Sequence, residues 1–254
     1  MTTGYLEELF TLDGRLALVT GASSGIGKAM ATALGRAGAR LILVARGEAA
    51  LAGTLRELEA LGCTARHLPV DLADRGAIAR LVAEVTAVDI LVNSAGVNIR
   101  PPLDELSEVD WGRTLAVNLT APFLLGQHYG PRMARQGFGR IITLASQQSV
   151  RAYGNSGAYG AAKAGVAGLI RSQAEAWSRF GVCCNAVVPD VVRTPMTEPF
   201  FADPERARAA AARTMVGRNG EPGDFAGIAV FLASAASSHI TGQTIFVDGG
   251  FSVH

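Results

Sequence analysis

The sequence predicts a single α/β domain built on a doubly wound parallel sheet of about seven strands flanked by helices. Short runs rich in Val, Ile and Leu alternate with Ala- and Leu-rich stretches along all 254 residues. A glycine-rich turn follows the first of these runs. Strands that are apolar on both faces and alternate with helices are typical of a parallel sheet covered on both sides. Right-handed crossovers then place the ligand beyond the carboxyl ends of the strands, as in Rossmann-type folds.

The individual elements follow from this alternation. We expect strands at residues 16–20, 40–45, 65–70, 89–93, 140–145, 182–188 and 244–247. Helices are expected between the first pairs, at 28–37 and 48–61. No linker, internal repeat or low-complexity tract interrupts the chain, so we expect one domain over residues 1–254. Residues 190–218 break the rhythm with three prolines, and we expect a substrate lid there in preference to a covering flap.

Composition argues against several classes of partner. The net charge is +1, with hydrophobic residues at 49% and charged residues at 18%. Nothing here suggests a nucleic-acid surface or a membrane-binding patch, and no apolar run approaches the ~20 residues that span a bilayer. The three cysteines fit reduced thiols, and the scattered histidines provide no metal-site spacing. We therefore expect a cytoplasmic protein that acts on a small molecule and holds no metal.

The glycine-rich turn is the candidate nucleotide site. Its glycines stand at 21, 25 and 27, between an expected strand and an expected helix. Glycines allow the backbone to approach a pyrophosphate, and the helix offers its positive N-terminus to the anion. The cofactor-binding residues expected from this turn are Gly21, Ser23, Ser24, Gly25, Ile26 and Gly27.

The end of the second expected strand favours NADP(H) over NAD(H). NAD-binding sites commonly place an acidic residue there to bind the ribose 2′-hydroxyl, whereas an arginine suits a 2′-phosphate. This chain has Arg46, and Glu48 is better explained as the start of the next helix. NAD(H) stays possible if Arg46 is only a solvated surface residue.

A tyrosine and a lysine four residues apart form the candidate catalytic pair. Tyr159 and Lys163 fall on one face of an expected helix, and Ser146 precedes them. A free tyrosine titrates near pH ~10, and a neighbouring ammonium is expected to lower this pKa towards the range of acid/base catalysis. Tyr153 lacks such a partner, because Gly157 stands four residues later. The pattern indicates hydride-transfer chemistry on an alcohol or ketone.

Over nearly its whole length the chain resembles the short-chain dehydrogenase/reductase family. The resemblance rests on the glycine turn and on these further residues: Asp71, Leu72, Asn93, Ser94, Ala95, Gly96, Asn118, Ser146, Tyr159, Lys163, Pro189 and Thr194. It implies that Tyr159 is the general acid/base and that Lys163 lowers its pKa and binds the nicotinamide ribose. Ser146 would bind the substrate oxygen, and Asn118 would hold a water that relays protons to Lys163.

The resemblance also implies the remaining cofactor contacts. Asp71 would meet the adenine, residues 93–96 would line the adenosine side, and Thr194 would meet the carboxamide or the pyrophosphate, with Leu72 and Pro189 as further cofactor-binding residues. Two positions depart from the family pattern, namely Ser94 in place of a second Asn and Asp190 in place of Gly. Asp190 adds bulk and charge where a close backbone approach or a positive φ is usual, which puts the placement of the cofactor in doubt.

Polar residues around the catalytic group suggest a hydroxylated, carboxylated substrate. The expected substrate-binding residues are Arg100, Gln148, Arg151, Ser146 and Tyr159, with Asn98 and Gln147 nearby. The segments around them resemble the gluconate 5-dehydrogenase-like branch of sugar-acid and polyol dehydrogenases. Alternatives are a 3-oxoacyl carrier-protein reductase and a non-catalytic nucleotide-binding relative. Small outward residues on the helices of Asn118 and Tyr159, together with the resemblance, predict a homodimer or homotetramer.

Overall fold

The computed structural model describes residues 3–254 and shows a seven-stranded, wholly parallel sheet. The strand order is β3-β2-β1-β4-β5-β6-β7. Strands β2 and β3 lie on one side of β1 and strands β4 to β7 on the other, as in a doubly wound sheet. The strands are β1 (Leu16–Thr20), β2 (Arg40–Ala45), β3 (Ala65–Pro69), β4 (Ile90–Asn93), β5 (Gly139–Leu144), β6 (Val182–Pro189) and β7 (Thr244–Val247). The predicted fold class is confirmed, and every predicted strand is present with ends shifted by at most one residue.

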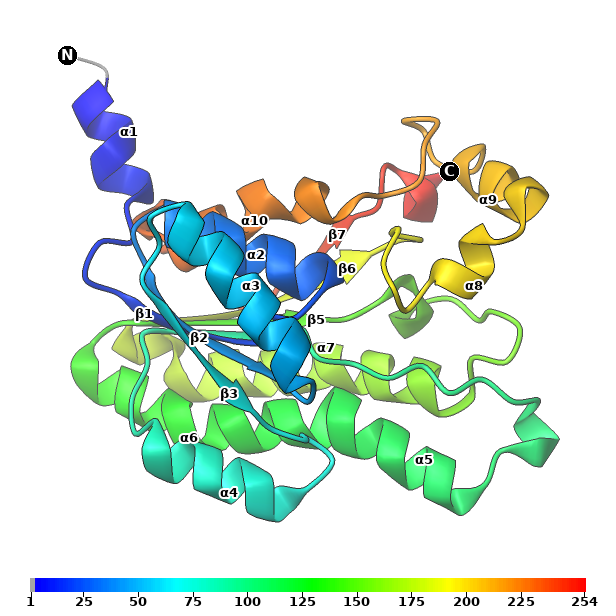
Figure 1. Ribbon diagram of the computed structural model, residues 1–254, viewed down its shortest axis with the longest axis horizontal. Coiled ribbons are helices and arrows are strands. Elements are labelled where there is room, and N and C mark those ends of the chain that lie inside the picture. Colours follow the sequence, from blue (N-terminus) through cyan, green and yellow to red (C-terminus); the bar gives the residue numbers. More distant parts are fainter. Residues whose placement is uncertain (1–2) are drawn as a thin grey trace.

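Helices cover both faces of the sheet (Figure 1). One layer holds α2 (Gly25–Arg36), α3 (Glu48–Ala60) and α10 (Ala226–Ala233); the other holds α4 (Arg75–Glu84), α5 (Glu108–Leu115), α6 (Ala121–Gln136) and α7 (Gly157–Trp177). The short helices α8 (Glu198–Phe201) and α9 (Pro204–Ala211) lie beyond the carboxyl ends of the strands, and α1 (Thr3–Phe10) projects from the opposite end. None of the described helices is long and apolar enough to cross a membrane.

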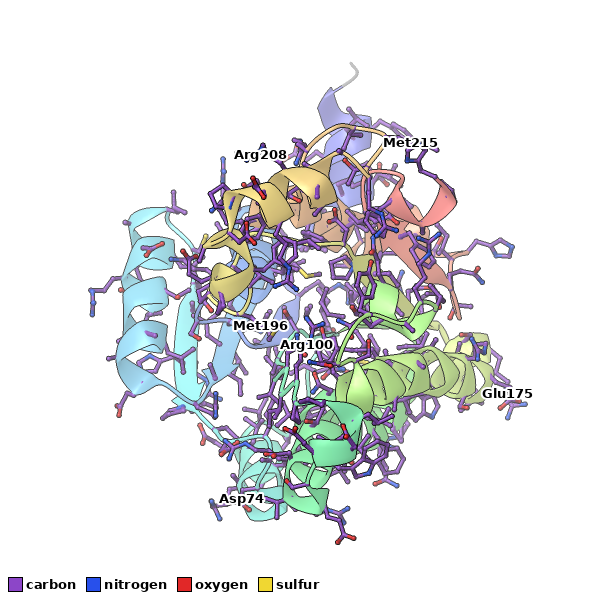
Figure 2. The ribbon with its side chains drawn as sticks, turned by 90° about the vertical axis from the view of Figure 1, so that its right-hand side faces the viewer. Asp74, Arg100, Glu175, Met196, Arg208 and Met215 are labelled. Atoms are coloured by element: carbon purple, nitrogen blue, oxygen red, sulfur yellow. The ribbon has the colours of Figure 1, made fainter. Side chains whose placement is uncertain are left out.

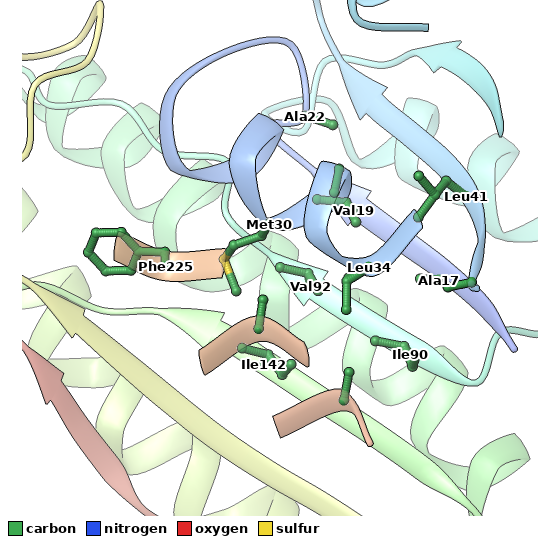
Figure 3. Packing of buried hydrophobic residues seen from close by; sticks show 14 of the residues in the cluster. Ala17, Val19, Ala22, Met30, Leu34, Leu41, Ile90, Val92, Ile142 and Phe225 are labelled. Atoms are coloured by element: carbon green, nitrogen blue, oxygen red, sulfur yellow. The ribbon is translucent and has the colours of Figure 1, made fainter. Parts of the chain in front are cut away.

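Two buried hydrophobic clusters hold these layers to the sheet. In the first, Met30 and Leu34 of α2 pack with Phe225 over Val92 and Ile142 of the central strands (Figure 3). All four positions of β4 are buried, as an interior strand of a covered sheet requires. The expectation that every strand is apolar on both faces is wrong for β3, where only part of the surface is covered because this strand is the edge of the sheet.

The second layer depends on two glycines where α6 meets α7. A side chain at Gly126 would come within 2.2 Å of the Gln173 amide, and one at Gly130 within 2.3 Å of the Trp177 ring. The close approach fixes α7 against the sheet. Since α7 carries Tyr159 and Lys163, this packing sets the position of the candidate catalytic pair.

The segment expected to form a lid leaves the sheet at the end of β6 and returns beside its own start. Backbone bonds from Gly220 N to Val191 O (3.1 Å) and from Arg193 N to Gly220 O (3.0 Å) close its base. Helices α8 and α9 form the excursion between these points. The segment is therefore an ordered, closed loop that overhangs the ligand-binding end of the sheet.

Candidate active site

A cleft of about 550 Å³ lies at the carboxyl ends of the central strands. Its walls come from the glycine turn, the loops after β2, β3 and β4, helix α7 and the start of the lid segment. The predicted cofactor residues that line it are Gly21, Ser23, Ser24, Gly25, Ile26, Gly27, Arg46, Asp71, Leu72, Ala95, Gly96, Tyr159, Lys163, Pro189 and Thr194. The structure thus brings together, in one cleft, residues spread over most of the chain.

The glycine turn is shaped by contacts that leave no room for side chains. Gly21 has a φ of 70°, and a Cβ there would lie 2.8 Å from Ala95 N. A Cβ on Gly27 would lie 2.4 Å from Gly21 O. Thr20 ties the two loops together, because its hydroxyl accepts bonds from Ser94 N (3.1 Å) and Ala95 N (3.2 Å). Sequence analysis did not single out Thr20, although its place directly before Gly21 was a usable signal.

Asn93 is the one predicted cofactor residue that does not line the cleft. Its side chain is 3% exposed and donates a hydrogen bond to Thr143 Oγ1 (3.1 Å) on the neighbouring strand β5. Asn93 therefore cross-links two strands, while Ser94, Ala95 and Gly96 present the loop to the cleft. The residue is turned inward because it is still part of β4.

Arg46 stands at the mouth of the cleft, just after β2, with its side chain exposed. Within residues 3–254 it forms no ion pair, so its guanidinium is available for an anion. Glu48 is the first residue of α3, as predicted, where a negative charge is favourable. This arrangement suits a 2′-phosphate better than a bare ribose hydroxyl.

Lys163 is buried one helical turn from Tyr159 on α7. Its ammonium lies 5.6 Å from the centre of the Tyr159 ring and donates a hydrogen bond to Leu144 O (2.6 Å). Burial lowers the pKa of Lys163 to about 8. The lysine therefore has an anchor on β5 and a proton that is easily released near neutral pH.

In the chain alone the pKa of Tyr159 lies above its usual value, and the lowering expected from Lys163 stays a prediction. Burial raises the pKa of Tyr159, while hydrogen bonding from the Ser146 side chain and the positive charge of Arg100 act to lower it. Desolvation disfavours the phenolate more strongly than these groups favour it. Arg100, predicted to contact substrate, is thereby close enough to the phenol to influence its charge.

Asn118 lies in a π-helical turn, η2 (Ala116–Thr120), between α5 and α6. Its amide donates hydrogen bonds to Val97 O and Thr114 O, both at 2.9 Å. Its Oδ1 is buried with no hydrogen-bond partner among residues 3–254, and it lies 2.9 Å from where a Gly96 Cβ would be. A buried acceptor without a donor fits the predicted role of holding a water beside Lys163.

The loop after β5 positions Ser146 beside Tyr159. The Ser146 hydroxyl accepts a hydrogen bond from Gln148 N (3.2 Å), and the Ser149 hydroxyl donates to Lys163 O (2.9 Å). Arg100 donates to Gly154 O, which joins the loop after β4 to the segment leading into α7. Figure 2 places Arg100 and Met196 near the centre of this face, between the lid helices and α7.

Arg151 was expected to bind substrate, and the structure places it elsewhere. Its guanidinium donates to Ser252 O (3.4 Å) and lies 5.7 Å from the centre of the Phe251 ring. Arg151 does not line the cleft, and neither do Ser146, Arg100 and Gln148, but Ser146 and Arg100 are close enough to Tyr159 to act on its phenol. The turn after Ser146 directs this side chain towards the C-terminal segment, which sequence alone did not place there.

Asp190 does not crowd the cofactor cleft, contrary to the expectation from its departure from the family pattern. Pro189 lines the cleft, whereas Asp190 faces a separate cavity of about 320 Å³ together with Asp248 and Gly220. Asp190 has no positive φ. Burial raises the pKa of Asp190 to about 7, with Asp248 and Asp224 adding to the effect.

Comparisons with known proteins agree with this geometry. Residues 21–252 match a family model described as enoyl-(acyl carrier protein) reductase. Gluconate 5-dehydrogenase of Gluconobacter oxydans is 38% identical, covering 97% of this chain and 98% of the relative. D-Threitol dehydrogenase of Mycolicibacterium smegmatis is 40% identical, covering 96% and 95%. A gluconate 5-dehydrogenase of Burkholderia cenocepacia, solved in complex with NADP and tartrate, is 37% identical and has a TM-score of 0.90, covering 98% and 99%.

A doubly wound sheet with a glycine turn and a Ser-Tyr-Lys group defines a nicotinamide-dependent oxidoreductase. The chain belongs to the short-chain dehydrogenase/reductase family, as the matched family model and the full-length relatives show.

Proposed function

We propose that the protein transfers a hydride between NADP(H) and a secondary alcohol or ketone of a sugar acid or polyol. The observation that carries the substrate class is a set of polar groups on the two loops beside Tyr159. Asn98 Oδ1 and Gln148 Oε1 are both buried, and neither has a hydrogen-bond partner in the described part of the chain. Arg100 adds a positive charge near the phenol. Hydroxyl groups of a substrate would donate hydrogen bonds to these two oxygens, and a substrate carboxylate would pair with the Arg100 guanidinium.

The catalytic roles follow from the contacts of the four predicted residues. Tyr159 accepts the hydroxyl proton of the alcohol during oxidation and returns it during reduction. Ser146 hydrogen-bonds the substrate oxygen and keeps it next to the phenol. Lys163, anchored on Leu144 O, and a water on Asn118 Oδ1 carry the proton onward. The bound nicotinamide supplies the hydride acceptor or donor, and its oxidised ring adds a positive charge that favours the phenolate.

NADP(H) fits the residues that line the cleft. The backbone cradle at Gly21 and Gly27 has no space for a Cβ, which is the surface a pyrophosphate needs. Exposed Arg46 supplies a cation at the ribose end. NADP is bound in the Burkholderia relative. NAD(H) is the weaker alternative because no carboxylate stands at the position of Arg46.

Reduction of a 3-oxoacyl carrier protein is the second candidate, favoured by a 36% identical solved structure from Agrobacterium tumefaciens that is described as a 3-oxoacyl (acyl-carrier-protein) reductase. An acidic carrier protein requires a cationic docking face, and the net charge of +1 comes from interspersed signs. A purely cofactor-binding role is a third candidate. An intact set of Ser146, Tyr159 and Lys163 in one site argues against it.

We also propose a single domain with residues 190–218 as substrate lid, a homo-oligomeric assembly and a cytoplasmic location. The lid segment contributes Thr194, Pro195 and Met196 to the cleft. Exposed apolar residues on α5 and α6, namely Val109, Trp111 and Phe123, support a subunit interface. The cysteines are free and buried, which suits a reducing compartment.

The test is a turnover assay that follows the absorbance of the reduced nicotinamide. Sugar acids, polyols and 3-oxoacyl thioesters are each offered with NADP(H) and with NAD(H). The proposal expects turnover on a sugar acid or polyol with NADP(H). Turnover only on thioesters would establish the second candidate, and cofactor binding without turnover on any substrate would establish the third.

A further inference from the structure

Phe251 is a buried aromatic ring at which three separate parts of the chain meet. It is 3% exposed and begins the C-terminal turn η7 (Phe251–Val253). The Tyr153 ring, from the loop that carries Ser146, stacks on it with 6.5 Å between centroids and an interplanar angle of 25°. The guanidinium of Arg213, from the lid segment, lies 4.3 Å from the same ring centre. None of these contacts belongs to the cofactor cleft.

The lid is fastened to this C-terminal turn by close backbone packing. Val216 N donates to Gly249 O (3.2 Å). A Cβ on Gly249 would lie 2.6 Å from the Val216 side chain, and one on Gly250 would lie 2.8 Å from Met215. Figure 2 shows Met215 beside the C-terminal turn at the upper edge of the molecule. Displacement of the returning end of the lid must therefore displace the turn that holds Phe251.

The turn itself is rigid because Asp248 caps it from within. The Asp248 carboxylate accepts hydrogen bonds from Gly250 N (3.0 Å) and Ser252 N (2.9 Å), and the side chain is 6% exposed. Phe251 N also donates to Asp248 O (3.1 Å). A turn held by three internal bonds moves as one body.

Tyr153 connects Phe251 to the residue next to Ser146. Its hydroxyl donates a hydrogen bond to Gln147 Oε1 (2.5 Å), and Gln147 is 3% exposed. Gln147 O accepts bonds from Val150 N (3.1 Å) and Arg151 N (3.0 Å), which close the turn that follows Ser146. The position of Tyr153 therefore bears on the backbone that aims the Ser146 hydroxyl at the substrate.

We propose that Tyr153 and Phe251 are positioning residues that couple the substrate lid to Ser146. When the lid settles on a substrate, Arg213 and the Val216–Gly249 bond hold the C-terminal turn, and the stacked rings hold the Ser146 loop through Gln147. A substrate that leaves the lid displaced leaves Ser146 misaligned. The pair thus contributes to substrate selection without touching the substrate. This inference rests on the proposed function, in which Ser146 binds the reacting oxygen and residues 190–218 cover it.

Kinetics of two single variants and their combination test the coupling. Tyr153→Phe removes the hydroxyl bond and keeps the stack, whereas Phe251→Leu removes the ring that Tyr153 and Arg213 share. Each is expected to lower kcat/KM for the substrate by about threefold to tenfold, with KM for NADP(H) unchanged. The double variant should be no worse than the more affected single variant, because both break one linkage.

Phe180→Leu is the matched control. Like Phe251, Phe180 has an arginine over its ring, with Arg179 4.8 Å from the ring centre. Unlike Phe251, it is 45% exposed and lies at the far end of α7. It should leave kcat/KM unchanged. Multiplicative effects of Tyr153→Phe and Phe251→Leu, or wild-type kinetics in both, would overturn the proposal.

Hydrogen exchange tests the same linkage without requiring turnover. In Phe251→Leu, amides of residues 147–153 and of 213–216 should both exchange faster than in the wild type. Faster exchange confined to residues 249–254 would overturn the coupling. If the wild type turns over no sugar acid or polyol, the proposed function fails, and this readout still decides whether lid and loop are linked.

Discussion

Desolvation and hydrogen bonding have opposite effects on the pKa of Tyr159. Burial raises its pKa, and the Ser146 side chain and the Arg100 charge oppose that rise. A phenol that stays protonated in the chain alone is a proton donor for ketone reduction. Proton acceptance then requires further positive charge, which is what an oxidised nicotinamide provides.

Replacing Tyr159 by Phe removes the hydroxyl and preserves the ring. We expect turnover to fall by at least about a hundredfold, because the general acid/base is lost. Cofactor affinity, measured by NADPH fluorescence, should stay near the wild-type value. Tyr5→Phe, at a 67% exposed position on α1, is the control and should be silent. Normal turnover in Tyr159→Phe would refute the catalytic assignment.

Arg46→Asp replaces a cation that suits the 2′-phosphate of NADP(H) by a carboxylate that suits the ribose 2′-hydroxyl of NAD(H). We expect KM for NADP+ to rise by about tenfold to a hundredfold, since a hydrogen bond to a charged group is lost and a like charge is added. KM for NAD+ should fall. Arg40→Asp, at the opposite end of β2, is the control for charge change alone. Equal cofactor kinetics in Arg46→Asp and wild type would show that Arg46 does not meet the 2′-phosphate.

Residue positions in the site were predictable where they depend on local spacing and not where they depend on distant packing. The pairing of Tyr159 with Lys163 follows from a four-residue spacing on a helix. The inward turn of Asn93 depends on Thr143, fifty positions along the chain, which no local pattern indicates. The contacts of Arg151 and Tyr153 with Phe251 were missed for the same reason.

At the scale of elements, the lid is closed at its base by a short parallel bridge between Val192 and Gly220. Asp190 sits at this base, and a Cβ on Gly220 would lie 2.7 Å from its Oδ1. Asp248, Asp224 and Arg218 face the same cavity. Asp224 is already paired with Arg218 through two hydrogen bonds of 2.7 Å. The Arg218 guanidinium therefore does little to neutralise Asp190.

The folded chain is therefore expected to lose stability as pH rises towards neutrality. The pKa of Asp190 is about 7 in the folded state against a reference of 3.8. The folded state binds the proton more tightly, so this stabilisation is complete below pH ~4 and is lost as pH rises through ~7, amounting to about 1–2 kcal/mol after solvent screening.

Urea unfolding at several pH values measures this effect. Asp190→Asn should flatten the pH dependence of the unfolding free energy, and Asp104→Asn, at an exposed position, should leave it unchanged. Superimposable profiles for Asp190→Asn and wild type would show that Asp190 does not titrate in this range.

The strands were predicted well because each is rich in apolar residues, whereas only two helices were predicted, and α2 begins at Gly25 and not at residue 28. The strand bounds for β1, β2 and β7 agree to the residue. The helices α8 and α9 were not predicted, although α9 has a local start signal, since Asp203 caps it and Pro204 is its first residue.

At the scale of the whole molecule, the proposed interface is formed by α5, α6 and α7. Val109, Trp111 and Phe123 are 78%, 41% and 42% exposed on the first two of these helices. Apolar side chains of this size gathered on neighbouring helices are typical of a subunit contact.

Phe123→Glu is therefore expected to dissociate the assembly, because it places a charge in an apolar interface. Light scattering after size-exclusion chromatography measures the mass. Leu61→Glu, at a 55% exposed position at the end of α3, is the control and should keep the wild-type mass. A wild-type mass equal to the 26.4 kDa chain would refute the oligomer itself.

The π-helical turn at Ala116–Thr120 has a consequence for engineering. Such a turn is an α-helix that has accepted one extra residue, and it is less favourable than the regular form. Here it holds Asn118 with its Oδ1 unpaired beside Lys163. Selection for thermal tolerance alone would reward deletion of the extra residue, at the expense of the proposed proton path. A library that spans this turn must be screened for turnover and heat resistance together, because the two are opposed at this position.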